Sequence, residues 1–551
     1  MRIACALAAV AAIVVVALAG SPPPRGPVFT DITAAAGITF RHSVGDHKMD
    51  NIVEGTGAGA CFFDYDNDGL QDIYFVTGVW TKGVSDNDGR DLRGKLSNRL
   101  YRNLGNGRFE DVTAKAGVAS GIYGSGCSAA DYDNDGNVDL YVLNYGPNIL
   151  YHNNGDGTFT DFSKQSGLDD SRWSLHAVWF DYNNDGWLDV YVANYLLYDD
   201  GKFRDFYPAQ GYPGPLSYQG LPSILYRNNG DGTFTDVTKE AGMWKPGGRA
   251  MSVTAADFNN DGRMDVFTSN DAMENYFFIN KGDGTFAESG LEYELAFSEH
   301  GQGVASMGPF YGDVNRDGWL DLFVPNLNYV SLFVFNPKKG FYENLNDAAG
   351  LAPLLGQYAG WGSVMFDWDH DGWLDLFTVH GHAHHEYVQE DSLSRNRHDG
   401  TFEDVSREAG PYFETKRVGR GAAWADIDND GDIDLLVVNL NDAPVLLRND
   451  GGNARPWLMV DARLDFPGGS RTAVGARVTV TANGVRMIDD VNPVRGYLGQ
   501  GDPRLHFGLG GATVCDVEVR WPDGAVEKFP GVRANQVLTL RHKAEARRKA
   551  Q

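Results

Sequence analysis

The sequence predicts an all-β protein, a seven-bladed β-propeller followed by a small β-sandwich-like domain. Three observations carry this prediction: an acidic loop motif that occurs seven times, a spacing that fits a four-stranded repeat, and a change of composition near residue 453. The spacing between loop starts ranges from 50 to 76 residues, a period typical of propeller blades with insertions in the longer repeats. The loops begin at Asp64, Asp131, Asp181, Asp257, Asp313, Asp367 and Asp426.

Each loop fits the pattern D-x-[DN]-x-D-G-x-x-D, in which the glycine at position 6 permits a sharp turn. Side-chain oxygens at positions 1, 3, 5 and 9, with the carbonyl of position 7, can surround one hard cation in the way that calcium prefers. The sequence therefore predicts up to seven Ca²⁺ ions as cofactors. The candidate ligands are Asp64, Asp66, Asp68, Leu70 and Asp72; Asp131, Asp133, Asp135, Asn137 and Asp139; Asp181, Asn183, Asp185, Trp187 and Asp189; Asp257, Asn259, Asp261, Arg263 and Asp265; Asp313, Asn315, Asp317, Trp319 and Asp321; Asp367, Asp369, Asp371, Trp373 and Asp375; and Asp426, Asp428, Asp430, Asp432 and Asp434.

The EF-hand is excluded because it needs a bidentate Glu at position 12 and flanking helices. Position 12 is instead an aromatic, aliphatic or Thr residue in runs that are typical of buried strands: Phe75, Val142, Val192, Thr268, Val324, Thr378 and Val437. A metal-free acidic β-turn is the alternative. Seven copies with the same glycine favour the metal loop.

The acidity of the chain resides in these loops. The protein has 74 acidic and 47 basic residues and a formal net charge of −27. Without the 25 carboxylates at loop positions 1, 3, 5 and 9, the count would be 49 acids against 47 bases. Seven divalent ions would change the formal charge from −27 to −13. Nucleic acid is not an expected partner, because phosphate binding needs a basic face.

The last repeat shows the predicted unit: an inner strand over Arg420–Ala425, the loop, and strands over Leu435–Asn439 and Val445–Asn449. Other repeats add a fourth strand after an Asn-Gly-Asp-Gly turn, which is a hairpin signal. No such strand follows loop 7, but Val28-Phe-Thr-Asp-Ile-Thr33 matches it. We predict that residues 28–33 complete the last blade and close the ring, because closure removes exposed sheet edges.

The predicted domain boundaries are a signal peptide over residues 1–19, a Pro-rich linker over 20–27, the propeller over 28–452, an all-β domain over 453–542 and a tail over 543–551. An apolar stretch behind Arg2 and a small-x-small site ending at Ala19 indicate the signal, with an uncleaved N-terminal anchor as the alternative. No membrane span is expected after cleavage. A secreted, extracellular or periplasmic location follows, where weak calcium sites stay filled.

The C-terminal domain is predicted from short alternating strands separated by turn residues. They are Trp457–Val460, Ala476–Thr481, Arg504–Phe507, Val517–Trp521 and Val537–Leu540.

Three cysteines remain after cleavage: Cys61, Cys127 and Cys515. Cys61 and Cys127 precede loops 1 and 2 in neighbouring repeats, so a disulfide between them is one interpretation. We favour buried free thiols, since cysteine is among the most buried residue types.

Two insertions lie outside the repeat pattern. Residues 195–222 are rich in Tyr, Phe, Pro and Gly and include Tyr207, Tyr212 and Tyr218. Exposed aromatic rings there would suit sugar stacking or protein contact, whereas a self-packed loop that covers the blade is the slightly favoured alternative. The second insertion holds His380, His382, His384 and His385. Alternate histidines of a strand would share one face and could bind zinc or copper, but hydrogen-bonded or surface histidines are favoured.

Several motifs resemble the cartilage acidic protein family, whose members join FG-GAP/VCBS calcium repeats to a C-terminal ASPIC/UnbV domain. The motifs that carry the resemblance are Leu225–Thr238, Arg420–Asp434, Leu446–Gly451, Val474–Val478, Gly501–Gly510 and Val519–Gly524. The resemblance implies a secreted, calcium-binding propeller similar to integrin α-chain repeats, without established catalytic activity. The chain departs from the family pattern at Pro213 and at His380-Gly-His382, so the resemblance does not explain the histidines.

No catalytic signature was found: the sequence has no G-x-S-x-G elbow, no H-E-x-x-H and no phosphate-binding loop. The sequence therefore predicts a binding or adhesion module for a protein or glycan ligand. One alternative is a propeller-borne enzyme that acts on polysaccharide, with a transition metal at His380–His385. A purely structural component of an envelope complex is the other.

Overall fold

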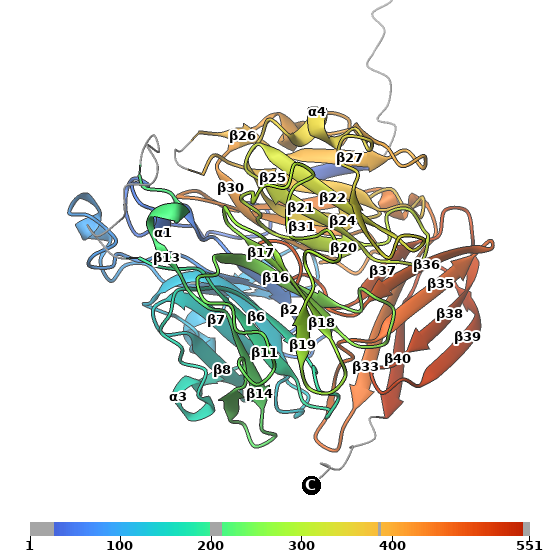
Figure 1. Ribbon diagram of the computed structural model, residues 1–551, viewed down its shortest axis with the longest axis horizontal. Helices are drawn as coiled ribbons and strands as arrows, with labels where there is room; N and C mark the ends of the chain where they lie inside the picture. Colours follow the sequence, from blue (N-terminus) through green and yellow to red (C-terminus); the bar gives the residue numbers. More distant parts are fainter. Residues whose placement is uncertain (1–26, 199–211, 384–386, 544–551) are drawn as a thin grey trace, which may run out of the picture.

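The computed structural model describes residues 27–198, 212–383 and 387–543, and the statements below refer to them. The predicted signal peptide, nearly all of the linker and most of the tail lie outside these residues. Strands dominate the chain (Figure 1), and the all-β class is confirmed. The helical pieces are short: α1 (Ile52–Gly55), η1 (Asp88–Leu92), α2 (Thr113–Ala116), α3 (Ser163–Ser166), η2 (Pro215–Ser217), α4 (Leu351–Leu355), η3 (Pro411–Glu414) and η4 (Gly452–Ala454).

Seven four-stranded antiparallel sheets each contain one acidic loop, placed between the first and second strand of the sheet. Their strands are, in the order of the loops, β2 (Ala60–Phe63), β3 (Asp72–Phe75), β4 (Arg99–Asn103) and β5 (Phe109–Asp111); β6 (Tyr123–Ala130), β7 (Asp139–Tyr145), β8 (Ile149–Asn153) and β9 (Phe159–Asp161); β10 (Ser174–Phe180), β11 (Asp189–Asn194), β14 (Ile224–Asn228) and β15 (Phe234–Asp236); β16 (Ala250–Ala256), β17 (Asp265–Asn270), β18 (Tyr276–Asn280) and β19 (Phe286–Glu288); β20 (Phe310–Gly312), β21 (Asp321–Asn326), β22 (Tyr329–Asn336) and β23 (Phe341–Asn344); β24 (Gly360–Phe366), β25 (Asp375–His380), β27 (Ser392–Asn396) and β28 (Phe402–Asp404); and β30 (Gly419–Ala425), β31 (Asp434–Asn439), β32 (Val445–Asp450) and β1 (Val28–Asp31). Two small ribbons pair β12 (Leu196–Leu197) with β13 (Gln219–Gly220) and β26 (Gln389–Glu390) with β29 (Lys416–Arg417).

The first and last sheets are joined at two places. β1 pairs with β32, with Val28 opposite Asp450, which is where the sequence analysis placed residues 28–33. In addition, the Asn103 side chain of the first sheet donates to the Ile427 carbonyl of loop 7 at 2.8 Å. Both ends of the array are therefore held by hydrogen bonds, and β1 covers the edge that β32 would otherwise expose.

An asparagine at the end of the third strand repeats this contact around the array. In six sheets its amide donates to the backbone carbonyl at loop position 2 of the preceding sheet, at 2.8–3.1 Å: Asn103, Asn153, Asn228, Asn280, Asn396 and Asn449. The fifth sheet has Phe335 at the equivalent place. These hydrogen bonds join neighbouring sheets next to the acidic loops.

The C-terminal domain has two four-stranded sheets that lie beside the propeller (Figure 1, orange and red). Their apolar faces enclose a separate core that includes Val478, Val519 and Trp521. The strands are β33 (Trp457–Asp465), β34 (Ser470–Thr472), β37 (Leu505–Gly508) and β40 (Val537–Lys543) in one sheet, and β35 (Arg477–Ala482), β36 (Val485–Asp490), β38 (Val514–Arg520) and β39 (Val526–Arg533) in the other.

Residues 491–502, which we call the axial segment, leave the C-terminal domain between β36 and β37 and are buried among the first strands of the seven sheets. One contact for each sheet, in order, is Gln500 N to Ala60 O, Cys127 N to Leu498 O, His176 Nε2 with Gly499 O, Ser252 Oγ to Gly496 O, Arg495 Nη1 to Tyr311 O, the Tyr497 ring against Trp361, and Asp502 N to Trp424 O. The centre of the propeller is therefore filled by the chain itself, which the sequence analysis did not anticipate.

Glycines in the first strands make room for this segment. A Cβ on Gly59 would lie 2.3 Å from the Leu498 carbonyl oxygen, and one on Gly126 would lie 2.3 Å from the Leu175 carbonyl oxygen. Real Cβ atoms do not approach backbone so closely, so only glycine fits where strands and axial segment meet.

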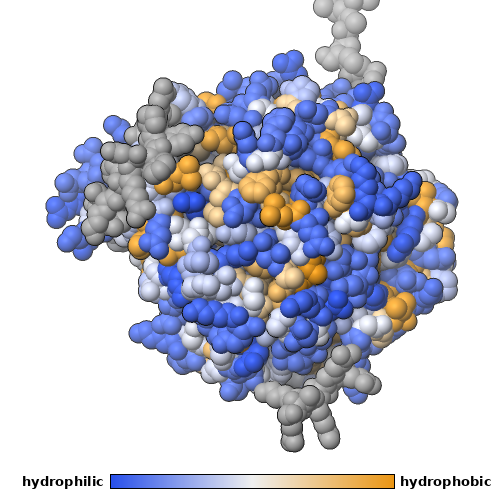
Figure 2. All heavy atoms as spheres, in the orientation of Figure 1, coloured by the Kyte–Doolittle hydropathy of each residue, from blue (hydrophilic) through white to orange (hydrophobic). Residues whose placement is uncertain are grey.

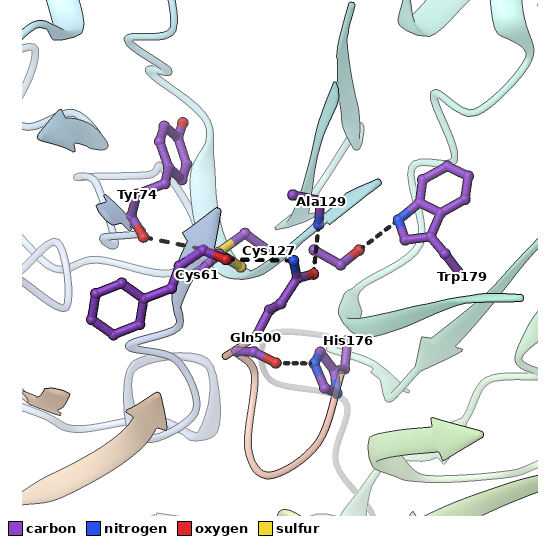
Figure 3. Close-up of a disulfide and its surroundings, with 10 residues drawn as sticks. Cys61, Tyr74, Cys127, Ala129, His176, Trp179 and Gln500 are labelled. Carbon is purple, nitrogen blue, oxygen red and sulfur yellow. Dashed lines mark hydrogen bonds between the residues drawn. A yellow bond between two sulfur atoms is a disulfide. The ribbon is translucent and has the colours of Figure 1, made fainter. Parts of the chain in front are cut away.

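Cys61 on β2 and Cys127 on β6 form a disulfide beside the axial segment (Figure 3). The favoured interpretation of free thiols is therefore wrong for this pair, whereas Cys515 is free and buried. Adjacent first strands bring the two Cα atoms to 6.1 Å, within the range for a disulfide. Gln500 lies next to the bond, and its side-chain oxygen accepts from the Ala129 N–H at 2.8 Å.

The surface seen in Figure 2 is largely hydrophilic, with apolar residues in scattered patches. Among the described residues, no helix combines the length and the apolar character needed to span a bilayer.

Candidate metal centres

The seven loops share one backbone arrangement built around position 1. Its carboxylate accepts the N–H groups of positions 5 and 6 at 2.6–3.2 Å in every loop. The residue at position 4 has a left-handed φ of 54–61°, which asparagine tolerates better than most residues. The loop is thus closed on itself by its own aspartate.

Position 9 ties each loop to its sheet. One carboxylate oxygen accepts an N–H at the end of the third strand at 2.7–3.0 Å in all seven sheets. The other oxygen accepts the N–H of position 2 in six loops, whereas in loop 4 the Asp265 Oδ2 is buried and has no hydrogen-bond partner. Position 9 therefore builds the fold as well as the candidate site.

Position 3 divides the loops into two groups. Loops 1, 2, 6 and 7 have aspartate there, and in each case its Oδ1 is buried without a hydrogen-bond partner: Asp66, Asp133, Asp369 and Asp428. In the same four loops, three carboxylate oxygens lie within 4.8 Å of one another. A buried oxygen without a partner is unfavourable, and a cation among the three would satisfy it. These loops therefore fit calcium.

Loops 3, 4 and 5 have asparagine at position 3. The amides of Asn183, Asn259 and Asn315 donate to the carboxylate at position 5 at 2.9–3.1 Å. In the described part of the chain, no three carboxylates of these loops converge as they do in the other four. The sequence analysis treated the seven loops alike, but the structure brings together a full set of carboxylates in four.

Burial raises the pKa of several loop carboxyl groups, and the neighbouring carboxylates raise it further. The pKa of Asp64 and Asp131 is raised to about 6, and that of Asp72 and Asp139 to about 8. A metal ion needs deprotonated ligands, so calcium binding would release protons from these loops near neutral pH.

Basic side chains sit beside some of the loops. Arg102 lies 2.6 Å from Asp66 and 2.9 Å from Asp68, and His152 lies 3.4 Å from Asp133. Arg455 lies 3.2 Å from Asp369. In loop 7, the Arg504 side chain donates to the backbone carbonyl of Asp426 at 3.1 Å.

Contacts between loops were missed by the sequence analysis. The side chain at position 4 donates to the position 6 carbonyl of the next loop: Asn67 to Gly136, Asn134 to Gly186, Asn260 to Gly318, Arg316 to Gly372, and Asn429 to Gly69. Asparagine occupies position 4 in five of the seven loops. That recurrence is the feature of the sequence from which these contacts between loops could have been predicted.

Within the described part of the histidine insertion, His380 agrees with the favoured interpretation of a hydrogen-bonded histidine. β25 ends at His380, so the strand-like alternation expected for His380, His382 and His384 does not extend past its first member. His380 is buried, contacts the Glu390 carbonyl through Nδ1 at 2.8 Å and stacks on Tyr358. Burial lowers its pKa to about 4. His384 and His385 lie outside the described residues.

The aromatic insertion packs against the protein. Tyr195, Tyr212 and Tyr218 are buried, and the Tyr212 hydroxyl donates to the Ala383 carbonyl at 2.5 Å. Burial of Tyr212 and Tyr218 agrees with the favoured interpretation of a self-packed insertion and excludes exposed rings at these two positions, because both pack in an apolar cluster with Tyr497 and Leu498 of the axial segment. Tyr207 lies outside the described residues.

A cleft of about 600 Å³ with a mixed polar and apolar lining separates loops 1, 2 and 7 from the C-terminal domain. Asp64 and Asp131 lie on its propeller side, and basic side chains line it from the C-terminal domain: Arg463, Arg471, Arg504 and Arg541. Its size is that of a ligand site, and it borders three of the four loops with converging carboxylates.

Comparisons with known proteins agree with the repeat structure. FG-GAP-like repeats match residues 64–142, 131–192, 216–268, 258–324, 313–378 and 367–437, and an ASPIC and UnbV domain matches residues 467–547. Cartilage acidic protein 1 of Xenopus tropicalis is 27% identical over 497 residues, which cover 86% of this chain and 62% of that protein. The Homo sapiens protein of the same name is 27% identical over 495 residues, with 86% and 60% covered.

The chain thus spans less than two thirds of the length of these relatives. A solved structure of an Agrocybe aegerita lectin that recognises non-reducing terminal N-acetylglucosamine is 18% identical, with a TM-score of 0.36, over 63% of this chain and 79% of that chain. This similarity is too low to support a conclusion about the fold or the ligand of this chain. The matched repeats cover most of the chain and are followed by the C-terminal match, so the chain belongs to the family of FG-GAP-like repeat proteins with an ASPIC and UnbV domain, as its motifs predict.

Proposed function

We propose that the protein is an exported, calcium-loaded propeller that acts as an extracellular binding or adhesion-type module for a glycan or protein ligand. The observation that carries the calcium proposal is the buried Oδ1 at position 3 of loops 1, 2, 6 and 7, which has no hydrogen bond; in loop 6 it lies 3.2 Å from Arg455. In each of these loops it belongs to a group of converging carboxylates.

Calcium suits these loops better than magnesium or zinc. The donors are carboxylates and a backbone carbonyl, all oxygen, and the position 1 and 9 carboxylates already hold backbone N–H groups. Calcium accepts such irregular, high-coordination oxygen sets, whereas magnesium demands near-octahedral geometry and zinc prefers nitrogen and sulfur. When bound, calcium would neutralise the acidic loops and fix them against their neighbours.

Export is supported by the disulfide between Cys61 and Cys127, since disulfides persist in oxidising compartments and are rare in the cytosol. The apolar N-terminal stretch of the sequence is in line with this location.

Two features of the structure support binding over catalysis: the contents of the propeller centre and the contacts of the loop carboxylates. The axial segment fills the middle of the propeller, and the carboxylates of the loops are committed to backbone and metal. We place the ligand in the cleft beside loops 1, 2 and 7. Arg463 and Arg541, whose ion pairs with Asp461 and Asp465 are partly exposed, would exchange them for an anionic group such as a carboxylate or sulfate of a glycan.

The proposal is tested with residues 28–543, screened against glycan and matrix-protein arrays in calcium and after metal removal. We expect calcium-dependent capture of an anionic ligand that weakens at least tenfold in Arg463→Ala, Arg541→Ala. The matched control is Arg533→Ala, an arginine on β39 outside the cleft. Capture that survives removal of all calcium would refute the calcium-dependent module. Equal capture by the cleft variant and the control would refute the cleft.

A further inference from the structure

A buried group of two histidines and an aspartate lies where loops 6 and 7 meet the C-terminal domain. His370 is position 4 of loop 6, Asp432 is position 7 of loop 7, and His506 lies on β37. The side chains of His370 and Asp432 are fully buried. The His370 and His506 rings lie with their centroids 4.6 Å apart.

Each of the three side chains has one buried atom without a hydrogen bond. These atoms are Nε2 of His370, Nε2 of His506 and Oδ1 of Asp432, all buried without a hydrogen bond. His370 Nε2 and Asp432 Oδ1 are 3.3 Å apart. Three polar atoms without hydrogen bonds in one buried cluster are unusual, because buried polar groups nearly always form hydrogen bonds.

The other end of each side chain is held by backbone. His370 Nδ1 contacts the Arg455 carbonyl oxygen at 3.4 Å, and Asp432 Oδ2 accepts the Gly451 N–H at 3.3 Å. His506 is hydrogen-bonded to the backbone of Gly431. A proton on His370 Nδ1, inferred from its carbonyl contact, leaves a lone pair on Nε2 that faces the carboxylate.

We propose that His370, Asp432 and His506 form a zinc site that joins loops 6 and 7 to the C-terminal domain. Two imidazole nitrogens and one carboxylate oxygen are a zinc donor set, and backbone contacts to the far side of a histidine are the usual support of such ligands. Calcium does not fit here, because it takes oxygen ligands. Two of its ligands lie in loops 6 and 7, but their side chains are not the side-chain ligands expected for calcium, since position 4 is not a ligand and position 7 would contribute its backbone carbonyl.

The site needs one local adjustment. Among the described residues, the donor atoms of His370, Asp432 and His506 do not all lie within 4.8 Å of one another, so zinc must draw the His506 ring toward the other two atoms. A water molecule would fill the fourth position of the tetrahedron. Since the ligands come from two loops and from β37, zinc would lock the C-terminal domain onto the propeller.

The test starts from untagged protein expressed in zinc-supplemented medium, purified without chelator and dialysed against calcium buffer with trace zinc. Elemental analysis should find about one zinc per chain, and X-ray absorption should show nitrogen and oxygen ligands. Wild-type protein with less than about one tenth of an equivalent of zinc would overturn the proposal. In that case, the alternative is a proton shared between Asp432 and His370.

Two variants locate the metal. His370→Asn restores the residue that five other loops carry at position 4, so it should fold normally and lose zinc at least tenfold, as should His506→Gln. The control is a His384→Ala, His385→Ala variant. Loss of zinc in this control, with retention in His370→Asn, would place the metal in the histidine insertion and refute our site. The calcium-dependent melting of each variant reports whether it has folded.

Discussion

Replacing Asp428 by asparagine tests the calcium proposal, because its effect on the stability of the protein should differ in sign between calcium-loaded and metal-free protein. Asp428 is position 3 of loop 7, its Oδ1 is buried without a partner, and it belongs to a group with Asp426 and Asp434. Asparagine keeps the shape and one oxygen but removes the charge. With calcium, the variant should be less stable than wild type, whereas without metal it should be equally stable or more stable.

The magnitudes follow from binding linkage. A ligand present at 100 times its dissociation constant stabilises the native state by about 2.7 kcal/mol. A tenfold loss of affinity at loop 7 then reduces the stability by about 1.4 kcal/mol in saturating calcium. Without metal, removal of the unpartnered charged oxygen should raise the stability by about 1 kcal/mol.

The assay is denaturant or thermal unfolding of wild type and Asp428→Asn, each in saturating calcium and after complete metal removal. Asn315→Asp in loop 5 is the converse control, because it adds a carboxylate to a loop whose amide is already bonded to Asp317. It should lower stability without metal and recover it in calcium. If Asp428→Asn changes stability by the same amount in both conditions, loop 7 does not bind calcium.

Three further outcomes are expected. First, a group whose folded pKa is raised stabilises the protein fully below its unfolded pKa, and this contribution is lost as pH rises through the folded pKa. Metal-free protein should therefore melt at a higher temperature at pH 5 than at pH 8.5, since burial raises the pKa of Asp72 and Asp139 to about 8. A flat or opposite profile in a scanning melt would contradict this. Second, Gly499→Ala should destabilise the protein by about 1–3 kcal/mol, because the new Cβ would lie 2.5 Å from the Ala60 carbonyl oxygen. Gly511→Ala, which meets nothing within 4 Å, is the control, and equal melting of the two variants would show that the axial segment is not tightly packed. Third, deletion of residues 28–33 should expose β32 as an edge and cause aggregation in light scattering; a monomer that melts like wild type would rule out closure by β1.

The sequence by itself determined the parts of the protein that depend on short-range patterns. The glycine at loop position 6, the acids around it and the apolar run that follows are local in sequence, and they were sufficient to predict a loop between two strands. The same is true of the closing strand, because Val28–Asp31 carries the repeat's own fourth-strand pattern. The prediction was possible because the motif occurs seven times, and each copy independently indicates the same loop and strands.

Only the tertiary structure decided which residues meet across the molecule. Gln500 contacts the strand that holds Cys61, and nothing in the composition of residues 491–502 shows that they fill the propeller. The Cys61–Cys127 disulfide depends on the spacing of two adjacent first strands. The division of the loops into two groups depends on where one side-chain oxygen points, and the His370–Asp432–His506 group draws on two loops and another domain. Such contacts are set by packing between segments far apart in the chain, so local periodicity does not encode them.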